Sequence, residues 1–275
     1  MLNLADRQTQ IANPVYIPQA SPTLLALDFD GVLCDGMLEY FQTTWKAYCQ
    51  LWSVEKTEPP SDLAPQFYRT RPVIETGWEM PLLLYGLLQG IPSTEILHNW
   101  YAIAPQLLQD SKLDKAQLVA AVDGCRDRWI ANDLEGWLSL HRFYHGVIER
   151  LRSLLDSATD LAIITTKEER FARQLLQQQG IDLPKGAVYG KGSQQPKHET
   201  LRQLGGADGG AIWFVEDRLK TLQSVQQQPD LSSVRLFLAD WGYNIARDRK
   251  IVRDDPRLQP LSLTQFAQDF SQWPI

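Results

Sequence analysis

Continuous apolar runs that stop at polar or charged residues recur along the chain and predict buried β-strands. Three such runs cover residues 24–27, 161–164 and 211–215, and residues 234–239 form a fourth strand candidate. A strand that is covered by helices on both faces is apolar throughout instead of alternating, which is typical of parallel sheets. The runs therefore predict a mostly parallel sheet.

Helical patterns separate the later strand candidates. Apolar residues recur at helical spacing over residues 147–155, 168–179 and 197–204, and the last two segments end at Gly180 and Gly205. Strands and helices that alternate in this way predict an α/β fold, with a Rossmann-like sheet and helices on both faces. Ligands of such sheets bind outside the carboxyl ends of the strands.

The stretch from residue 36 to residue 142 breaks this alternation, because its patterns are helical throughout. The predicted helices cover residues 37–54, 74–89, 93–109 and 113–134. An all-helical insertion directly after the first strand would lie over the end of that strand. We therefore expect three parts: an N-terminal arm (1–22), a sheet domain (23–35 and 143–275) and a helical cap domain (36–142).

Composition and charge exclude several classes of protein. The 275 residues include 33 acidic and 27 basic side chains, a net charge of −6, and 44% are hydrophobic, which predicts a folded, mildly acidic protein. Binding to nucleic acid needs an excess of clustered Lys and Arg that this chain lacks. The longest apolar run, residues 80–88, is roughly half of what a membrane span needs.

The N-terminus has no apolar segment of the secretory type, and the three cysteines are too few and scattered for a disulfide framework. We therefore expect a cytoplasmic protein without a nucleic-acid or membrane partner. Its oligomeric state stays open.

Polar residues follow three of the predicted strands at the edge where a ligand would bind. They are Asp28 and Asp30 after the first strand, Thr165 after the second, and Glu216 and Asp217 after the third. The turn at Gly31 allows both aspartates to approach one centre. An Asp-Gly pair alone commonly forms a turn or a cap. The combination over three strands, with Lys197 downstream, favours a functional site instead.

In order and spacing these residues resemble the four motifs of the haloacid dehalogenase superfamily. The motifs read Leu-Asp-Phe-Asp-Gly-Val-Leu-Cys-Asp (27–35), Ile-Ile-Thr-Thr-Lys (163–167), Pro-Lys (196–197) and Phe-Val-Glu-Asp-Arg (214–218). The fourth is similar to the Glu-Asp variant of phosphomutase-like and sugar-phosphatase members. Residues 143–148 resemble the segment where the chain of these proteins re-enters the core after a helical cap.

The resemblance implies a reaction through an aspartyl-phosphate. Asp28 would be the nucleophile, and Asp30 would protonate the leaving group and then activate water. Thr165, the amide of Thr166 and Lys197 would bind the phosphate.

The same resemblance implies a Mg²⁺ ion held by Asp28, the backbone carbonyl of Asp30 and Asp217, with Glu216 bound directly or through water. Lys191 is a second candidate for the role of Lys197. Arg218 stands where this variant often has Ser.

Taken together, the resemblance implies a Mg²⁺-dependent phosphomonoester hydrolase that acts on a small phosphorylated metabolite. Asp30 favours phosphoryl transfer over dehalogenation, because a halide leaving group needs no proton. Two alternatives stay open: a phosphomutase of the same superfamily, and a binding or regulatory protein with weak catalysis.

A polar and aromatic cluster in the predicted cap is a candidate for substrate specificity. Its members are Arg69, Arg71, Glu75 and Trp78. An arginine pair suits a second anionic group on the substrate. The alternative is a solvated helix face with i, i+4 pairs such as Arg71 to Glu75. The four histidines lack metal-ligand spacing and are interpreted as surface or packing residues.

Overall fold

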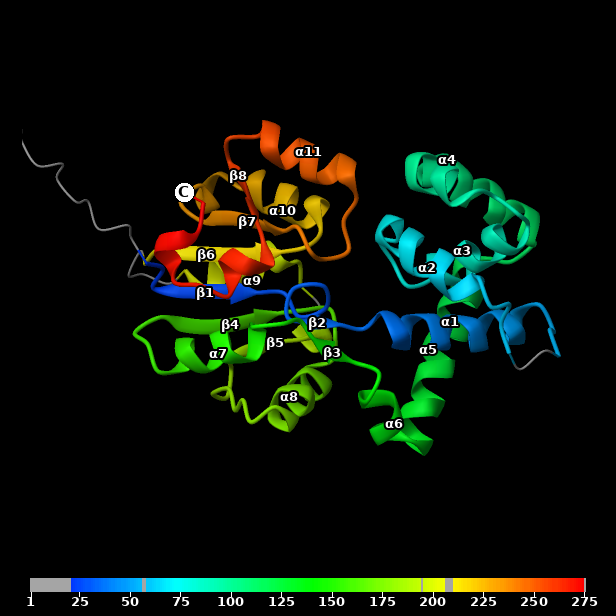
Figure 1. Ribbon diagram of the computed structural model, residues 1–275, viewed down its shortest axis with the longest axis horizontal. Coiled ribbons are helices and arrows are strands. Elements are labelled where there is room, and N and C mark those ends of the chain that lie inside the picture. Colours follow the sequence, from blue (N-terminus) through cyan, green and yellow to red (C-terminus); the bar gives the residue numbers. More distant parts are fainter. Residues whose placement is uncertain (1–20, 56–57, 194, 206–209, 275) are drawn as a thin grey trace, which may run out of the picture.

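A central parallel sheet organises the computed structural model, which describes residues 21–55, 58–193, 195–205 and 210–274. Six strands lie in the order β5-β4-β1-β6-β7-β8 (Figure 1). Their bounds are β1 (Leu24–Leu27), β4 (Asp160–Ile164), β5 (Val188–Tyr189), β6 (Ile212–Glu216), β7 (Arg235–Ala239) and β8 (Leu258–Leu261). Because β1 pairs with both β4 and β6, the three strands that carry the candidate residues are neighbours. The predicted α/β fold is confirmed.

Helices cover both faces of the sheet, as the apolar runs predict. The helices are α7 (Val147–Leu155), α8 (Glu169–Gln178), α9 (Lys197–Leu204), α10 (Leu219–Gln226), α11 (Ala246–Asp254) and α12 (Leu263–Phe266). Leu25 and Leu27 pack in one buried cluster with α7, α8 and α12, whereas Ala26 packs in another with α9, α10 and α11. Short 3-10 helices complete the elements: η1 (Arg71–Val73), η2 (Lys191–Ser193), η3 (Pro229–Leu231) and η4 (Phe270–Gln272).

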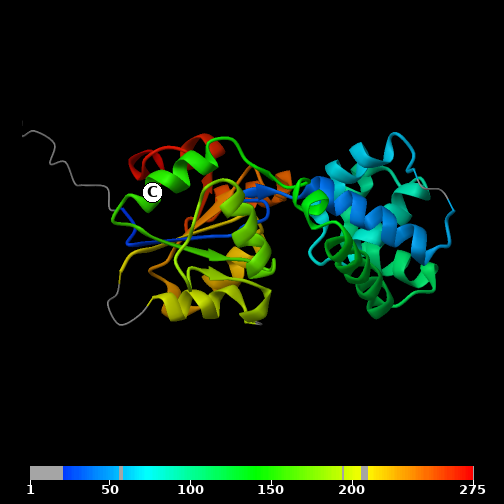
Figure 2. The ribbon, with the colours of Figure 1, turned by 90° about the horizontal axis from the view of Figure 1, so that it is seen from below.

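The remaining helices form a second body beside the sheet (Figures 1 and 2). They are α1 (Met37–Leu51), α2 (Leu63–Thr70), α3 (Glu79–Leu88), α4 (Ser93–Ser111), α5 (Lys115–Asn132) and α6 (Leu134–Leu138). A two-stranded antiparallel ribbon, β2 (Cys34–Asp35) with β3 (Arg142–Phe143), connects this insertion to the sheet.

The inserted helices have a hydrophobic cluster of their own, and that cluster is formed mainly by α1 to α5. Next to it, Glu39 of α1 is fully buried and accepts hydrogen bonds from Arg126 Nε (2.8 Å) and Thr43 Oγ1 (2.7 Å). The pair ties the first helix of the insertion to α5.

The structure differs from the predicted elements where local capping overrides the apolar pattern. The helix predicted from residue 74 begins at Glu79, because the Glu79 carboxylate accepts the amides of Glu75 and Thr76 before the helix starts. The helix predicted over residues 113–134 is α5, which ends at Asn132 because Asp133 leaves helical geometry and accepts the amide of Gly136 at the start of α6.

Among the elements that the sequence did not predict are α2, α11, α12, β5 and β8. The predicted N-terminal arm falls mostly on residues 1–20, which lie outside the described residues. No helix in the described part of the chain is long and apolar enough to cross a bilayer.

Candidate active site

Asp28 is the first residue beyond β1 and lies at the centre of the site. Its amide donates to Val215 O of the neighbouring strand, so the sheet pairing fixes its position. Its Oδ1 accepts hydrogen bonds from the amide of Phe29 (2.7 Å) and pairs with Lys197 Nζ (2.8 Å). The residue is only 7% exposed. Burial, partly offset by Lys197, raises the pKa of Asp28 to about 7.

Lys197, the first residue of α9, connects the ends of β1 and β6. Its Nζ lies 2.8 Å from Asp28 Oδ1 and 2.7 Å from Glu216 Oε2. Burial opposes the charge of this ammonium, but the two carboxylates outweigh it and raise the pKa of Lys197. The ammonium therefore stays charged between two acids.

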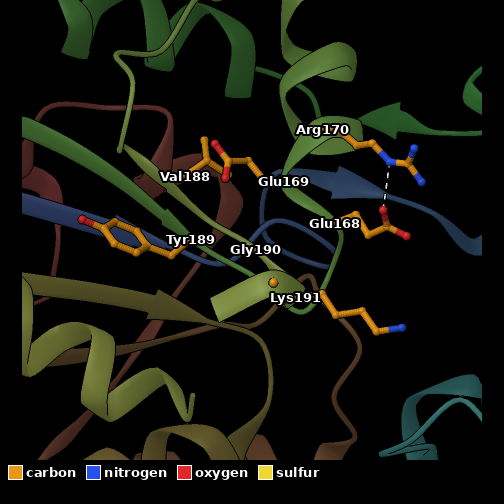
Figure 3. A pocket seen from close by; sticks show the side chains of 8 residues that line it. Glu168, Glu169, Arg170, Val188, Tyr189, Gly190 and Lys191 are labelled. Carbon is orange, nitrogen blue, oxygen red and sulfur yellow. Dashed lines mark hydrogen bonds and ion pairs between the residues drawn. The ribbon is translucent and has the colours of Figure 1, made fainter. Parts of the chain in front are cut away.

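Lys191, the other candidate, occupies a different place. It is exposed, and it lines a surface pocket with Glu168 and Arg170 (Figure 3). Its backbone amide donates to Lys167 O. Lys197 is thus the lysine that contacts the carboxylates.

Three buried carboxylates form a cluster that fits a divalent cation. Asp28, Glu216 and Asp217 each offer one oxygen, and these oxygens lie within 4.8 Å of one another. Burial and the Asp28 charge raise the pKa of Asp217 to about 6, and burial also raises the pKa of Glu216. Oxygen ligands of this kind are those that Mg²⁺ prefers.

The members of this cluster differ in how many of their oxygens are already bound. Glu216 Oε2 contacts Lys197, and its Oε1 accepts the amides of Asp217 and Arg218. Asp217 Oδ2 accepts the amide of Tyr243 at 2.6 Å. Asp217 is therefore better placed than Glu216 to bind an ion directly.

Gly31 makes the turn that brings this cluster together. Its φ of +86° belongs to the left-handed region that favours glycine, and a Cβ at this position would overlap the Asp217 carboxylate. The predicted role of this glycine in the turn is confirmed, and the structure adds the contact with Asp217.

Thr165 follows β4 and is buried, whereas Thr166 is exposed. Thr165 Oγ1 accepts the amide of Lys167 (3.1 Å), and a hydroxyl that accepts one bond still has its own proton to donate. Since Ile163 pairs with Leu27 in the sheet, Thr165 and Asp28 leave neighbouring strands at the same edge.

Sequence reasoning missed two residues near Asp30. Lys167 Nζ lies 3.2 Å from Asp30 Oδ1 and 3.3 Å from His141 Nε2. His141 is buried, as a packing residue would be, but it also contacts this lysine. Burial and the Lys167 charge lower the pKa of His141, so its ring is neutral at pH 7. Lys167 is the last residue of the second motif, and its position there was the available signal.

Tyr243 was missed because no motif surrounds it. Besides the bond from its amide to Asp217, its hydroxyl donates to Asp35 Oδ1 (2.7 Å) and accepts the amide of Gly36 (2.8 Å). The residue therefore connects the β6 end of the site to the strand that enters the insertion.

Of the four predicted cap residues, Arg71 lies nearest to this part of the site. Its guanidinium stacks on the rings of Tyr40 (4.7 Å) and Tyr243 (5.3 Å). Its Nη1 donates to Ile74 O, and its Nε is buried with no partner among the described residues. The i, i+4 pair with Glu75 is absent from the described residues, because Glu75 pairs with Lys220 of α10 instead (2.6 Å).

The other two predicted cap residues lie elsewhere. Arg69 is exposed on α2, and Trp78 packs beneath Lys115 at 4.5 Å. Arg218, which stands where this variant often has Ser, donates from Nη1 to both Pro72 O (2.8 Å) and Tyr243 O (2.5 Å), so it joins the inserted segment to the sheet domain.

The family follows from a match to residues 22–227, which fit the model of the haloacid dehalogenase-like hydrolases. The chain belongs to this family. The resemblance drawn from the four motifs is confirmed at that level. No match was found among curated proteins.

Solved structures share the fold at low sequence identity. A haloacid dehalogenase-like family protein from Streptococcus pneumoniae is 17% identical with a TM-score of 0.53, covering 86% of this chain and 94% of its own. A predicted phosphoglycolate phosphatase from Haemophilus somnus is 17% identical with a TM-score of 0.51, over 85% and 92% of the two chains. A predicted phosphatase from Clostridium acetobutylicum is 14% identical with a TM-score of 0.54, over 90% and 97%.

Proposed function

We propose that this protein is a Mg²⁺-dependent phosphomonoester hydrolase that acts on a small phosphorylated metabolite. One observation carries the proposal: Lys197 joins Asp28 to Glu216 at the strand ends, with Asp30 two residues further on. This arrangement offers a nucleophile, a proton donor and a place for phosphate at one edge of the sheet. The phosphatase names of two solved structures with this fold agree with the proposal.

In the first step, an Asp28 oxygen forms a bond to phosphorus while the bond from phosphorus to the ester oxygen breaks. Asp30 gives its proton to the departing alkoxide, and an aspartyl-phosphate results. In the second step, Asp30 takes a proton from water, whose oxygen attacks phosphorus and releases Asp28. The bonds from Phe29 and Lys197 orient the Asp28 carboxylate for both steps.

Binding of the negatively charged phosphate requires hydrogen-bond donors in addition to Lys197. The hydroxyl of Thr165 and the amide of Thr166 would supply them at the end of β4. Thr165 is held by the Lys167 amide, which fixes its oxygen relative to the sheet.

The residues that would hold Mg²⁺ are Asp28, Asp217 and the carbonyl of Asp30. Glu216, whose oxygens already accept hydrogen bonds, would bind it through water. When bound, the ion offsets the repulsion between the carboxylates and the phosphate.

The inserted helices would act as a cap that selects the substrate. Arg71 is the side chain that supports this, because its Nε is buried without a partner among the described residues and its guanidinium lies over two tyrosine rings. A substrate with a second anionic group would provide that partner. A cytoplasmic location fits the three free cysteines.

The test is phosphate release from a panel of phosphorylated metabolites, with Mg²⁺ and with EDTA. Asp28→Asn should abolish release, while Asp182→Asn, the same change at an exposed site, should not. Release that is independent of metal, or that persists in Asp28→Asn, would refute the proposal. No release but an isomerised product would indicate a phosphomutase instead. Neither release nor isomerisation from the folded protein would favour a binding or regulatory role.

A further inference from the structure

Lys167 is a buried cation for which the proposed reaction has no role. Its side chain is 8% exposed, and its Nζ lies 3.2 Å from Asp30 Oδ1. The ring centroids of Trp137 and Phe29 lie 5.4 Å and 6.0 Å from the ammonium. A buried ammonium is stable only when charged or polar groups compensate for its lost hydration. Asp30 is the carboxylate that does so here.

The second partner of Lys167 is a histidine with an assignable proton. His141 Nδ1 lies 3.2 Å from Trp137 O, and because a carbonyl can only accept, Nδ1 carries the hydrogen. Nε2 is then an acceptor, and it faces Lys167 Nζ at 3.3 Å. Lys167 therefore donates to His141 and forms an ion pair with Asp30.

These partners belong to the two segments that lead into and out of the inserted helices. His141 immediately precedes β3, the returning strand of the connecting ribbon. On the outgoing side, a Cβ on Gly36 would lie 3.6 Å from both Asp30 Oδ1 and His141 Cδ2. Asp30 itself forms a β-bridge with Cys34 of β2. The carboxylate of Asp30 thus lies against both connections.

We propose that Lys167 is a positioning residue for Asp30, and that His141 links it to the returning connection of the cap. The inference rests on the phosphatase function proposed above. When Asp30 gives its proton to the leaving alkoxide, a carboxylate remains, and an ammonium at hydrogen-bond distance stabilises it. Lys167 acts through Asp30 and not on the phosphate, so it matters only when the leaving group needs a proton.

Two aryl esters test this role, since phenolate is a much poorer leaving group than 4-nitrophenolate. In Lys167→Met, kcat/KM should fall by about 100-fold for phenyl phosphate and by less than about 10-fold for 4-nitrophenyl phosphate. Lys167→Arg should restore part of the loss on phenyl phosphate. His141→Gln should show a smaller loss in the same direction. Lys191→Met, which removes an exposed lysine nearby, should change neither substrate.

Equal losses on both esters in Lys167→Met would overturn the inference, because they would indicate contact with the phosphate or general damage. An unchanged kcat/KM for phenyl phosphate would overturn it as well.

A thermal double-mutant cycle tests the contact independently of turnover. The Tm losses of Asp30→Asn and Lys167→Met should not add: the double variant should lose less than the two single variants together. Additive losses would contradict the pairing of Lys167 with Asp30. If the native chain released no phosphate from any ester, the phosphatase proposal would fail, and the cycle alone would decide whether Lys167 positions Asp30.

Discussion

The backbone amide of Tyr243 donates a 2.6 Å hydrogen bond to Oδ2 of Asp217. This bond orients the carboxylate that is best placed to hold a cation, and it comes from a loop that no motif marks. Gly31 and Gly242 crowd the same carboxylate, since a Cβ on either would overlap Asp217. The geometry of the site therefore depends on backbone as much as on the acidic side chains.

Replacing Gly31 should damage metal binding more than folding. Gly31→Ala adds strain at φ +86° and pushes the Asp217 carboxylate away, so we expect Mg²⁺ affinity to fall by at least about 10-fold. Gly186→Ala is the matched control, because Gly186 has φ +85° but no atom within 4 Å of its Cβ position. The strained φ should cost each variant about 1–2 kcal/mol of stability, and Gly31→Ala carries the overlap with Asp217 in addition. Titration calorimetry with Mg²⁺ checks the affinity, and equal affinities in the two variants would contradict the role of Gly31.

Stability without metal should fall as the pH rises. Burial raises the pKa of Asp28 from 3.8 to about 7, so the folded state holds this proton more tightly than the unfolded state. Protonated Asp28 therefore stabilises the folded state at low pH, and this contribution to the free energy of unfolding is lost between about pH 4 and pH 7. In EDTA, Asp28→Asn should therefore gain about 2 kcal/mol relative to the native protein between about pH 5 and pH 8.

Urea unfolding at both pH values measures this difference. Adding Mg²⁺ should stabilise the native protein at the higher pH and have little effect on Asp28→Asn. If the stability difference between the two proteins did not change with pH, burial would not raise the pKa of Asp28 as expected.

The buried pair in the inserted helices should show the opposite pH dependence. Burial alone would raise the pKa of Glu39, but Arg126 and Thr43 lower it from 4.5 to about 2. The carboxylate therefore stabilises the fold above about pH 4.5, and this contribution is lost as the pH falls towards 2. Glu39→Gln should cost about 3 kcal/mol at pH 7 and much less at about pH 3.

An exposed pair provides the contrast in the same unfolding experiment. Asp230 pairs with Arg202 at the surface, where half of the Asp230 side chain is exposed. Asp230→Asn should cost much less stability than Glu39→Gln, because solvent screens the exposed pair. Comparable losses of stability in Asp230→Asn and Glu39→Gln would contradict the expectation that burial makes the Glu39 pair the stronger one.

Arg71 should affect only substrates with a second anionic group. Arg71→Met should raise KM for a phosphorylated carboxylic acid or a bisphosphate by about 10-fold or more, and leave uncharged alkyl phosphates unchanged. Arg69→Met is the control, because Arg69 is exposed in the same segment. Steady-state kinetics on the two classes of substrate check the prediction. A uniform rise in KM for both classes would indicate that Arg71 contacts the reacting phosphate instead.

The sequence predicted the central strands because each is a continuous apolar run with polar residues at its end. It did not predict β5 or β8, since Val188–Tyr189 is two residues long and Leu258–Leu261 contains glutamine and proline. Local patterns also missed the start of α3, where the Glu79 carboxylate binds amides that precede the helix.

Sequence patterns also predicted only part of the candidate site. Asp28, Asp30 and the acids after β6 follow strands and stand out in the sequence, whereas His141 and Tyr243 reach the site from distant segments. Their contacts depend on how the connecting ribbon and the loop after β7 fold back over the strand ends. A single sequence carries no local pattern for such contacts.

The antiparallel pairing of Cys34–Asp35 with Arg142–Phe143 brings the two ends of the helical insertion next to each other. None of the six strands of the main sheet depends on that insertion for its hydrogen bonds. A segment attached in this way can grow, shrink or be exchanged during evolution without disturbing the sheet. The chemistry of the strand ends and the choice of substrate can therefore diverge separately, which fits a fold shared at 17% identity or less with the proteins compared above.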